Sequence, residues 1–276
     1  MRLSNQLGRA FTTDFQYGHS GHSNPYNQRM ALYDDFVLCD HCSEQNPGRW
    51  NSEVFKRTAP LHLEIGSGYG EFMINFCAQN PHINFVGLDY RFKRSFQVAR
   101  KLSLTGAGTA IAENPPGFFR FLRAKGERIS FIFAENEVDV IYLFFPDPWP
   151  KNRHHKKRLL QRSFLENACK VLRPGGLIYI KTDHDGYYQW MLDSIFKFDH
   201  MRILFSTCDL WGTFDTLSVL SAAGSTANCN FAQQEHLSFL RWTKTKFEEI
   251  FLQQNIKIKA IVLQSGLDNI QRELVD

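Results

Sequence analysis

The sequence runs LHLEIGSGYG from Leu61 to Gly70 and continues into Glu71–Ala78, a segment with helical spacing. Residues 61–65 alternate between apolar and polar side chains, as a half-buried strand does. Glycines allow a tight turn and let a ligand approach backbone that side chains would block. A strand, a glycine turn and a helix in this order predict a ligand-binding loop in an α/β fold.

A second predicted strand ends in Asp89, roughly 20 residues beyond the glycine loop. A carboxylate in that place accepts hydrogen bonds from both hydroxyls of a ribose, so a dinucleotide and S-adenosylmethionine (SAM) both fit. Two features favour SAM: the loop is G-x-G-x-G rather than G-x-G-x-x-G, and Glu64 precedes it. A carboxylate there repels a pyrophosphate but suits a sulfonium and an amino-acid ammonium group.

The third repeat of strand and helix is less regular. We expect a short strand over residues 106–112, a turn over residues 113–117 and a short helix over residues 118–125. Asn114, in the turn, either hydrogen-bonds an adenine edge or is a plain turn asparagine.

A buried strand, Val138–Phe145, runs into a turn of three prolines that contains Asp147 and Trp149. Proline has no N–H for a strand ladder and restricts the residue before it, so the strand ends and the turn is rigid. Ligands bind at that carboxyl edge in open α/β sheets. Seven of the next eight residues, Lys151–Arg158, are Lys, Arg or His. The combination predicts a site for a base on a phosphate backbone; a solvated helix start is the alternative for the cations.

Two later segments carry polar residues at positions where a ligand could bind. A buried strand, Leu177–Lys181, ends in Thr182 and Asp183, which places Asp183 on the same sheet edge as Asp147. Asp183 fits a ligand contact, a helix N-cap or both. Thr245, with Glu248 three residues later, has the pattern of a capping box at the start of a helix.

The composition of the 276 residues excludes some classes of protein. The net charge of +4 alone does not indicate nucleic acid. No segment has the roughly 20 apolar residues of a membrane helix, and the start has no secretory signal, so we expect no membrane association. Cys39 and Cys42 form the only close cysteine pair, and a zinc site needs two more ligands, so we expect no metal. The cysteine pattern predicts a reduced, cytoplasmic setting.

Four segments together carry a resemblance: Glu64–Phe72, Phe145–Arg158, Lys181–Asp183 and Thr245–Glu248. In this order they resemble the tRNA (guanine-N7-)-methyltransferase family, and the proline–tryptophan stretch with its basic tail is the most specific of them. The resemblance implies a SAM-dependent enzyme that methylates N7 of guanine at position 46, in the variable loop of tRNA. The implied fold is α/β and Rossmann-like, a largely parallel doubly wound sheet with an antiparallel edge strand near the C-terminus.

The resemblance also implies roles for single residues. Asp147 would be the catalytic carboxylate. Residues that would bind SAM are Glu64, Gly66, Gly68, Gly70, Asp89, Asn114 and Asp147. Residues that would contact the substrate are Lys151, Asp183, Thr245, Lys246, Phe247 and Glu248. The cations that we expect on RNA phosphates are Arg153, Lys156, Lys157 and Arg158.

The expected domain organisation has three parts. They are a partly ordered N-terminal arm over residues 1–56, a methyltransferase domain over residues 57–264 with a long loop or insertion at 207–230, and a polar tail over residues 265–276. A monomer and a homodimer both fit the sequence.

Three rival functions share some of these sequence features. One is a methyltransferase for an exocyclic amine of another RNA base. A second is a non-catalytic RNA-binding module, against which the acids at positions 64, 89, 147 and 183 argue. An NAD-linked oxidoreductase is disfavoured by the charge of Glu64 beside a pyrophosphate.

Overall fold

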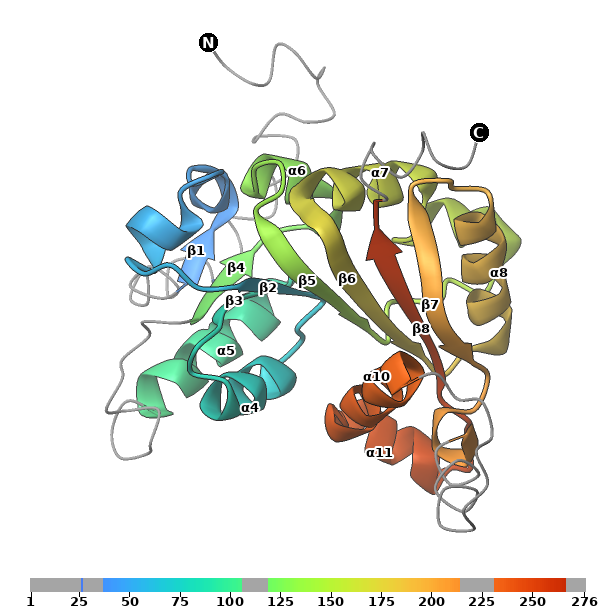
Figure 1. Cartoon of the computed structure of the whole chain (residues 1–276). Helices are drawn as coiled ribbons and strands as arrows, with labels where there is room; N and C mark the ends of the chain where they lie inside the picture. The colour runs from blue at the N-terminus through green and yellow to red at the C-terminus, as the bar shows by residue number, and fades with distance from the viewer. Residues whose placement is uncertain (1–25, 27–36, 106–118, 214–230, 267–276) are drawn as a thin grey trace, which may run out of the picture. The chain divides into compact units, whose positions relative to one another are not determined.

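The computed structural model describes residues 26, 37–105, 119–213 and 231–266 (Figure 1). Asn114 and the strand expected over residues 106–112 therefore lie outside the described residues, as do positions 214–230 of the expected long loop. Most of the expected arm and nearly all of the tail also lie outside them. The chain divides into two compact units, Met1–Ala134 and Glu135–Asp276.

The described residues of the first unit form four parallel strands in the order β1-β4-β3-β2. Their bounds are Val37–Cys39 for β1, Leu61–Ile65 for β2, Asn84–Leu88 for β3 and Phe119–Arg123 for β4. Its described ranges 37–105 and 119–134 contain the α-helices α4 (Glu71–Gln79), α5 (Phe92–Thr105) and α6 (Ile129–Ile132). Short helical turns are η4 (Asp40–Glu44), η5 (Trp50–Val54) and η6 (Gly126–Arg128). The strand, glycine turn and helix expected over residues 61–78 are confirmed.

The helix expected over residues 118–125 is wrong, because β4 forms there. β4 pairs with β3 on one side and with β1 on the other, and Phe119 and Phe121 are buried. A run of five residues is too short for its periodicity to separate a strand from a helix, so the pairing partners decide. One partner, β1, comes from the segment expected to be an arm.

The second unit has the strand order β5-β6-β8-β7. The bounds are Val138–Phe144 for β5, Leu172–Thr182 for β6, Met201–Thr207 for β7 and Lys259–Ser265 for β8. β5 and β6 pair in parallel, whereas β8 lies between β6 and β7 and is antiparallel to both. The antiparallel pairing expected near the C-terminus is confirmed.

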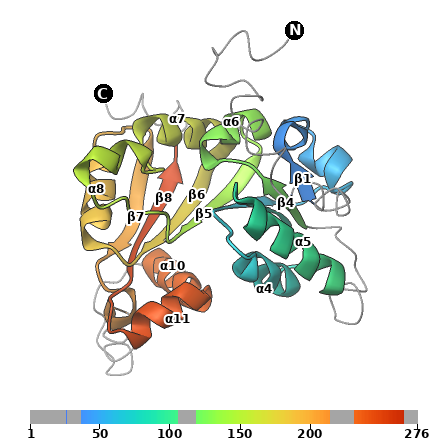
Figure 2. The same ribbon diagram turned by 180° about the vertical axis from the view of Figure 1, so that it is seen from behind.

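The described helices of this unit are η7 (Asn152–Lys157), α7 (Arg162–Val171), α8 (Asp185–Phe196), α10 (Phe231–Trp242) and α11 (Lys246–Gln253). Some of them cover the two faces of the strands β5 to β8 (Figure 2). Tyr142 and Tyr179 are register partners, and Phe239 of α10 lies 5.9 and 4.6 Å from their ring centroids. Side chains alternate between faces along a strand, so Ile178 and Ile180 point the other way. α7 and α8 cover that other face (Figure 2).

None of the helices in the described part of the chain has both the length and the hydropathy of a membrane span.

Candidate functional site

The turn after β5 has an unusual backbone conformation. Phe145 and Trp149 have φ of +56° and +43°, in the left-handed region that non-glycine residues rarely adopt. The N–H of Phe145 donates to the carbonyl of Lys181 at 2.8 Å, so the next strand holds the start of the turn. Asp147, between the two left-handed residues, is exposed. Such conformations persist only where the surroundings impose them, so we infer that the turn is held in place.

The basic run after this turn divides into exposed and buried cations. Lys151, Arg153, Lys156 and Lys157 are exposed, and Lys157 Nζ lies 4.8 Å from the ring centroid of Trp149. Arg158 is only 4% exposed and its Nε donates to the carbonyl of Pro148 at 2.9 Å. This placement does not fit the phosphate contact that we expected of Arg158, because a phosphate would have to reach a guanidinium that is almost fully covered.

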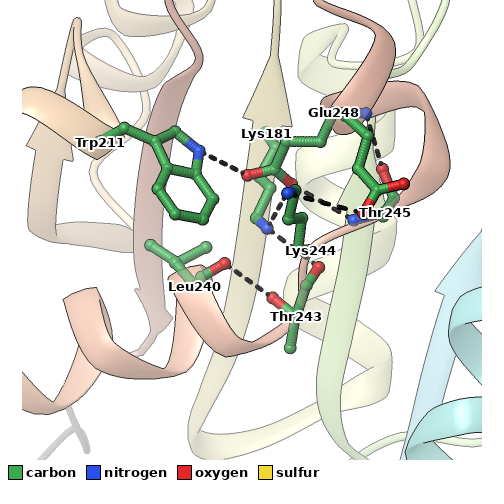
Figure 3. Close-up of polar contacts among 8 residues, drawn as sticks. Lys181, Trp211, Leu240, Thr243, Lys244, Thr245 and Glu248 are labelled. Atoms are coloured by element: carbon green, nitrogen blue, oxygen red, sulfur yellow. Dashed lines mark hydrogen bonds and ion pairs between the residues drawn. The ribbon is translucent and has the colours of Figure 1, made fainter. Parts of the chain in front are cut away.

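A buried ion pair connects β6 with α11 (Figure 3). Lys181 and Glu248 are both 0% exposed, and Lys181 Nζ lies 2.8 Å from Glu248 Oε2. Nζ also donates to the carbonyl of Thr243 at 3.0 Å, while Nε1 of Trp211 donates to Glu248 Oε1 at 2.9 Å. Burial lowers the pKa of the Lys181 ammonium, and the Glu248 carboxylate opposes that shift. Both carboxylate oxygens are therefore engaged inside the protein.

The expected capping box at the start of α11 is confirmed. Thr245 Oγ1 accepts from the N–H of Glu248 at 3.2 Å, and Glu248 Oε2 accepts from the N–H of Thr245 at 3.4 Å. Lys246 and Phe247 are exposed, with Phe247 at 51%. Of this segment, Lys246 and Phe247 thus face solvent, whereas the placement of Glu248 favours holding the helix over contacting a substrate.

The turn after β6 is held by a lysine of β8. Lys259, 3% exposed, donates to the carbonyl of Asp183 at 2.9 Å and pairs with Asp185 Oδ1 at 2.8 Å. The N-cap of α8 is His184, whose Nδ1 accepts from the N–H of Tyr187 at 3.0 Å, so an N-cap role for Asp183 is wrong. Within the described residues the Asp183 carboxylate has no hydrogen-bond or ion-pair partner, so it could accept one from a ligand.

In the first unit, the loop between β2 and α4 depends on its glycines. Gly66, Gly68 and Gly70 have φ of 82°, 57° and 69°, values that other residues adopt only with strain. A Cβ at Gly66 would meet nothing within 4 Å, and one at Gly68 only a backbone oxygen at 3.9 Å. The N–H groups of Gly66 and Ser67 donate to the carbonyl of Leu88 at 2.8 and 3.0 Å, which ties the loop to the end of β3.

Glu64, at the end of β2, is a buried acid with an unused acceptor. It is 5% exposed, and its Oε2 has no hydrogen-bond partner in the part of the chain described. Burial raises the pKa of Glu64 to about 8, a hydrogen bond from Ser67 opposes this, and the charge of Asp89 adds to it. An unsatisfied buried acceptor costs about 1–3 kcal/mol, so a ligand donor placed there would be stabilising.

Asp89, 4% exposed, already has partners within the unit. Its Oδ1 accepts from the N–H of Arg91 at 2.9 Å, and its Oδ2 pairs with Arg94 Nη1 at 3.0 Å. The Arg94 side chain is 29% exposed, so it can turn toward solvent when another donor, such as a ribose hydroxyl, takes its place.

Sequence comparisons identify the family. A family model described as "Putative methyltransferase" matches residues 58–218. A tRNA (guanine-N(7)-)-methyltransferase of Enterococcus faecalis is 37% identical over 169 residues, which are 61% of this chain and 73% of that protein. The chain belongs to the tRNA (guanine-N7-)-methyltransferase family. A bifunctional glycosyltransferase/methyltransferase of Fusobacterium nucleatum is 28% identical over 255 residues, 90% of this chain but 34% of that protein.

A structural comparison supports the fold of this tRNA (guanine-N7-)-methyltransferase family member. The 16S rRNA methyltransferase KamB aligns with a TM-score of 0.52 at 13% identity, over 78% of this chain and 92% of that one. At this identity the likeness concerns the fold alone, and it confirms the expected Rossmann-like methyltransferase fold.

The first unit fits the SAM on which the methyltransferase family depends. Glu64 offers an unpartnered buried carboxylate oxygen to an ammonium group, and Asp89 offers a carboxylate for ribose hydroxyls. The open space at the Cβ positions of Gly66 and Gly68 leaves room for a ligand against the backbone. The described side chains include no group of three or more His, Cys, Asp or Glu that could hold a metal; those of Cys39 and His41 are not among them.

Several residues that hold these segments were given no role by the sequence. Lys181 and Lys259 hold the Glu248 and Asp183 segments, and each lies at one end of an apolar strand run. A lysine in such a run signals a buried partner, because an unpaired buried charge is very costly. The sequence could not predict the hydrogen bond of Trp211, since its acceptor Glu248 lies 37 residues further along the chain.

Glu64 should make SAM affinity depend on pH. With a pKa of about 8, Glu64 is protonated in the free protein near neutral pH and must lose that proton to pair with an ammonium group. We therefore expect the affinity for SAM to rise about tenfold from about pH 6 to about pH 7, as calorimetric titration would measure.

Two variants check the assignment of this pH dependence. Glu64→Gln should bind SAM with little dependence on pH over that range, whereas Glu71→Gln, at the half-exposed start of α4, should behave like the wild type. An equally steep pH dependence in Glu64→Gln would remove Glu64 from SAM binding.

Proposed function

We propose that this protein transfers the methyl group of SAM to N7 of guanine 46 in the variable loop of tRNA. The reaction class, SAM-dependent methylation of guanine N7 in tRNA, is that of the family to which the chain belongs. The observation that carries the proposal is an exposed carboxylate, Asp147, on a turn whose flanking residues are both left-handed, followed directly by exposed cations.

The chemistry needs orientation and charge rather than a base. SAM supplies an electrophilic methyl group on a sulfonium, and guanine N7 has a lone pair and no proton, so no general base is required. In this proposal Asp147 accepts hydrogen bonds from N1–H and N2–H₂ of guanine. Its charge also offsets the positive charge that develops on the purine. Holding the reactants in the right geometry supplies most of the acceleration.

The first unit would hold SAM. Glu64 would accept from the ammonium group, Asp89 from the ribose hydroxyls and Asn114 would contact the adenine edge. The three loop glycines would let SAM approach the backbone.

The second unit would bind the tRNA. A guanine must leave its stack to reach an active site, and Trp149 is an aromatic on which it could stack, although it also fits an anchor of the turn. Lys151, Asp183 and the exposed residues of the segment that starts at Thr245 would contact the nucleotide. Arg153, Lys156 and Lys157 would bind phosphates. The proposal holds for a monomer or a homodimer and includes a cytoplasmic setting.

The direct test locates the methylated atom. The protein is incubated with methyl-labelled SAM and a tRNA transcript, and the digested nucleosides are separated. We expect label in 7-methylguanosine at position 46 and none in a transcript with adenine at that position. Label on an exocyclic amine would favour the rival methyltransferase, and tRNA binding without label would favour an RNA-binding module.

The exposed cations should set the salt dependence of tRNA binding. Each phosphate contact releases counterions, so Lys156→Gln and Lys157→Gln should each lower the log–log salt slope of the tRNA affinity by about 1. Filter binding over a salt series measures this slope. Lys170→Gln is the control, since Lys170 is a 54% exposed lysine of α7 outside the basic run and should leave the slope unchanged. If Lys156→Gln and Lys157→Gln both kept the wild-type salt slope, as Lys170→Gln should, these two lysines would not contact the tRNA.

A further inference from the structure

Arg158 hydrogen-bonds to the turn that contains Asp147. Its Nε donates to the carbonyl of Pro148 at 2.9 Å, and its own N–H donates to the carbonyl of His155 at 3.0 Å. The Pro148 carbonyl belongs to the planar peptide that joins Pro148 to Trp149, the residue with φ of +43°. A donor that fixes this peptide plane therefore fixes the backbone directly after Asp147, because the proline ring already restricts φ at position 148.

The surroundings of Arg158 fix the donor itself. The guanidinium lies 5.0 Å from the ring centroid of Tyr187 and 4.9 Å from that of Trp190, both on α8. Tyr187 is 0% exposed, so the stack belongs to the core of the unit. Two rings of α8 thus pack against the guanidinium, whose Nε donates to the carbonyl of the turn.

Burial of this cation is costly. Nη1 of Arg158 is buried and has no hydrogen-bond partner within the described ranges of the chain. An unsatisfied buried polar group costs about 1–3 kcal/mol, and an apolar residue of similar volume would avoid that cost. An apolar residue at position 158 would therefore stabilise the fold more than arginine does. It could not, however, donate a hydrogen bond to the carbonyl of Pro148.

We propose that Arg158 is a positioning residue, which fixes the Asp147 turn through the carbonyl of Pro148 and binds no phosphate. The inference rests on the proposed role of Asp147 and adds a residue that acts on it through the backbone of the turn. It separates the last cation of the basic run from Lys156 and Lys157 in function. Lysine cannot replace it, because an ammonium group neither stacks as a plane nor presents the same donor.

The test compares three variants of the full chain. Arg158→Lys should lower kcat about 10- to 100-fold at saturating tRNA, as expected for a misplaced reacting group. It should leave the SAM dissociation constant and the salt slope of tRNA binding unchanged. Arg153→Gln, the exposed matched cation, should lower the salt slope of tRNA binding by about 1, an effect that Arg158→Lys should not have. Ile195→Ala removes buried apolar volume from α8 but leaves both rings beside Arg158 in place, so it should lower Tm and leave kcat within about twofold.

Defined outcomes would overturn the inference. A reduced salt slope with normal kcat in Arg158→Lys would make Arg158 a phosphate contact. Equal loss of kcat in Arg158→Lys and Ile195→Ala, in proportion to their loss of Tm, would make Arg158 a merely structural residue. If Arg158→Lys does not fold, Arg158→Met fills the same volume without a donor and should fold with the same loss of kcat.

Asp147→Asn separates this inference from the proposed function. Full turnover in Asp147→Asn would refute the role given to Asp147. Lost turnover in Asp147→Asn together with normal kcat in Arg158→Lys would refute the positioning role of Arg158 alone.

Discussion

Replacement of Asp147 by asparagine is expected to lower kcat about 10²- to 10³-fold, the range for loss of one preorganised electrostatic contact to a transition state. Asparagine keeps the size of the side chain but removes its charge and one of the two acceptors that, in the proposed function, would accept from N1–H and N2–H₂ of guanine. Asp147 is exposed on a turn held by Phe145 and Pro148, so the substitution should not disturb the fold.

Single-turnover methylation of tRNA measures this effect, and calorimetry with SAM alone should give an unchanged dissociation constant. The matched control is Asp193→Asn, an exposed carboxylate on α8 of the same unit that hydrogen-bonds only to Gln189 among the described contacts. It should keep normal turnover. A fully active Asp147→Asn would show that the carboxylate takes no part in the reaction.

Loss of the buried charge pair is expected to have the largest effect on stability. Glu248→Gln is nearly isosteric and can still accept from Trp211, but it leaves the Lys181 ammonium without a counter-charge at 0% exposure. Removing one partner of a buried ion pair lowers the free energy of unfolding by about 3–5 kcal/mol. Lys181→Met should cost a similar amount, and the double variant should cost less than the sum of the two.

Urea unfolding of the four proteins yields the coupling energy. In Glu248→Gln the folded pKa of Lys181 should fall further below its unfolded value, because burial already lowers it and the opposing carboxylate is gone. The unfolded state then binds more protons, so the stability deficit should shrink as pH rises toward about 10. The exposed pair Lys244–Glu249 is the control, and Glu249→Gln should change stability by less than about 1 kcal/mol. A deficit below 1 kcal/mol in Glu248→Gln would contradict the account.

Local patterns were sufficient for several features of this protein. The glycine loop, the capping box of Thr245 and Glu248, and the exposed cations at positions 151, 153, 156 and 157 all appear where the sequence predicts them. Each depends on interactions between residues a few positions apart, which short-range periodicity, φ preference and charge pattern report directly. The family assignment likewise follows from motifs that are contiguous in sequence.

Other features depend on residues far apart in the chain. β4 is a strand because β1 and β3 pair with it, although a helix was expected over residues 118–125. Arg158 belongs to an exposed run by sequence but is buried because Tyr187 and Trp190 of α8 pack against it.

Contiguous residues therefore specify the turns, caps and motifs of this chain, and with them its family. The burial of single charges and the pairing of short strands came only from tertiary packing. The physical reason is that desolvation and hydrogen-bond satisfaction depend on every neighbour in space, and most of these neighbours are distant in sequence.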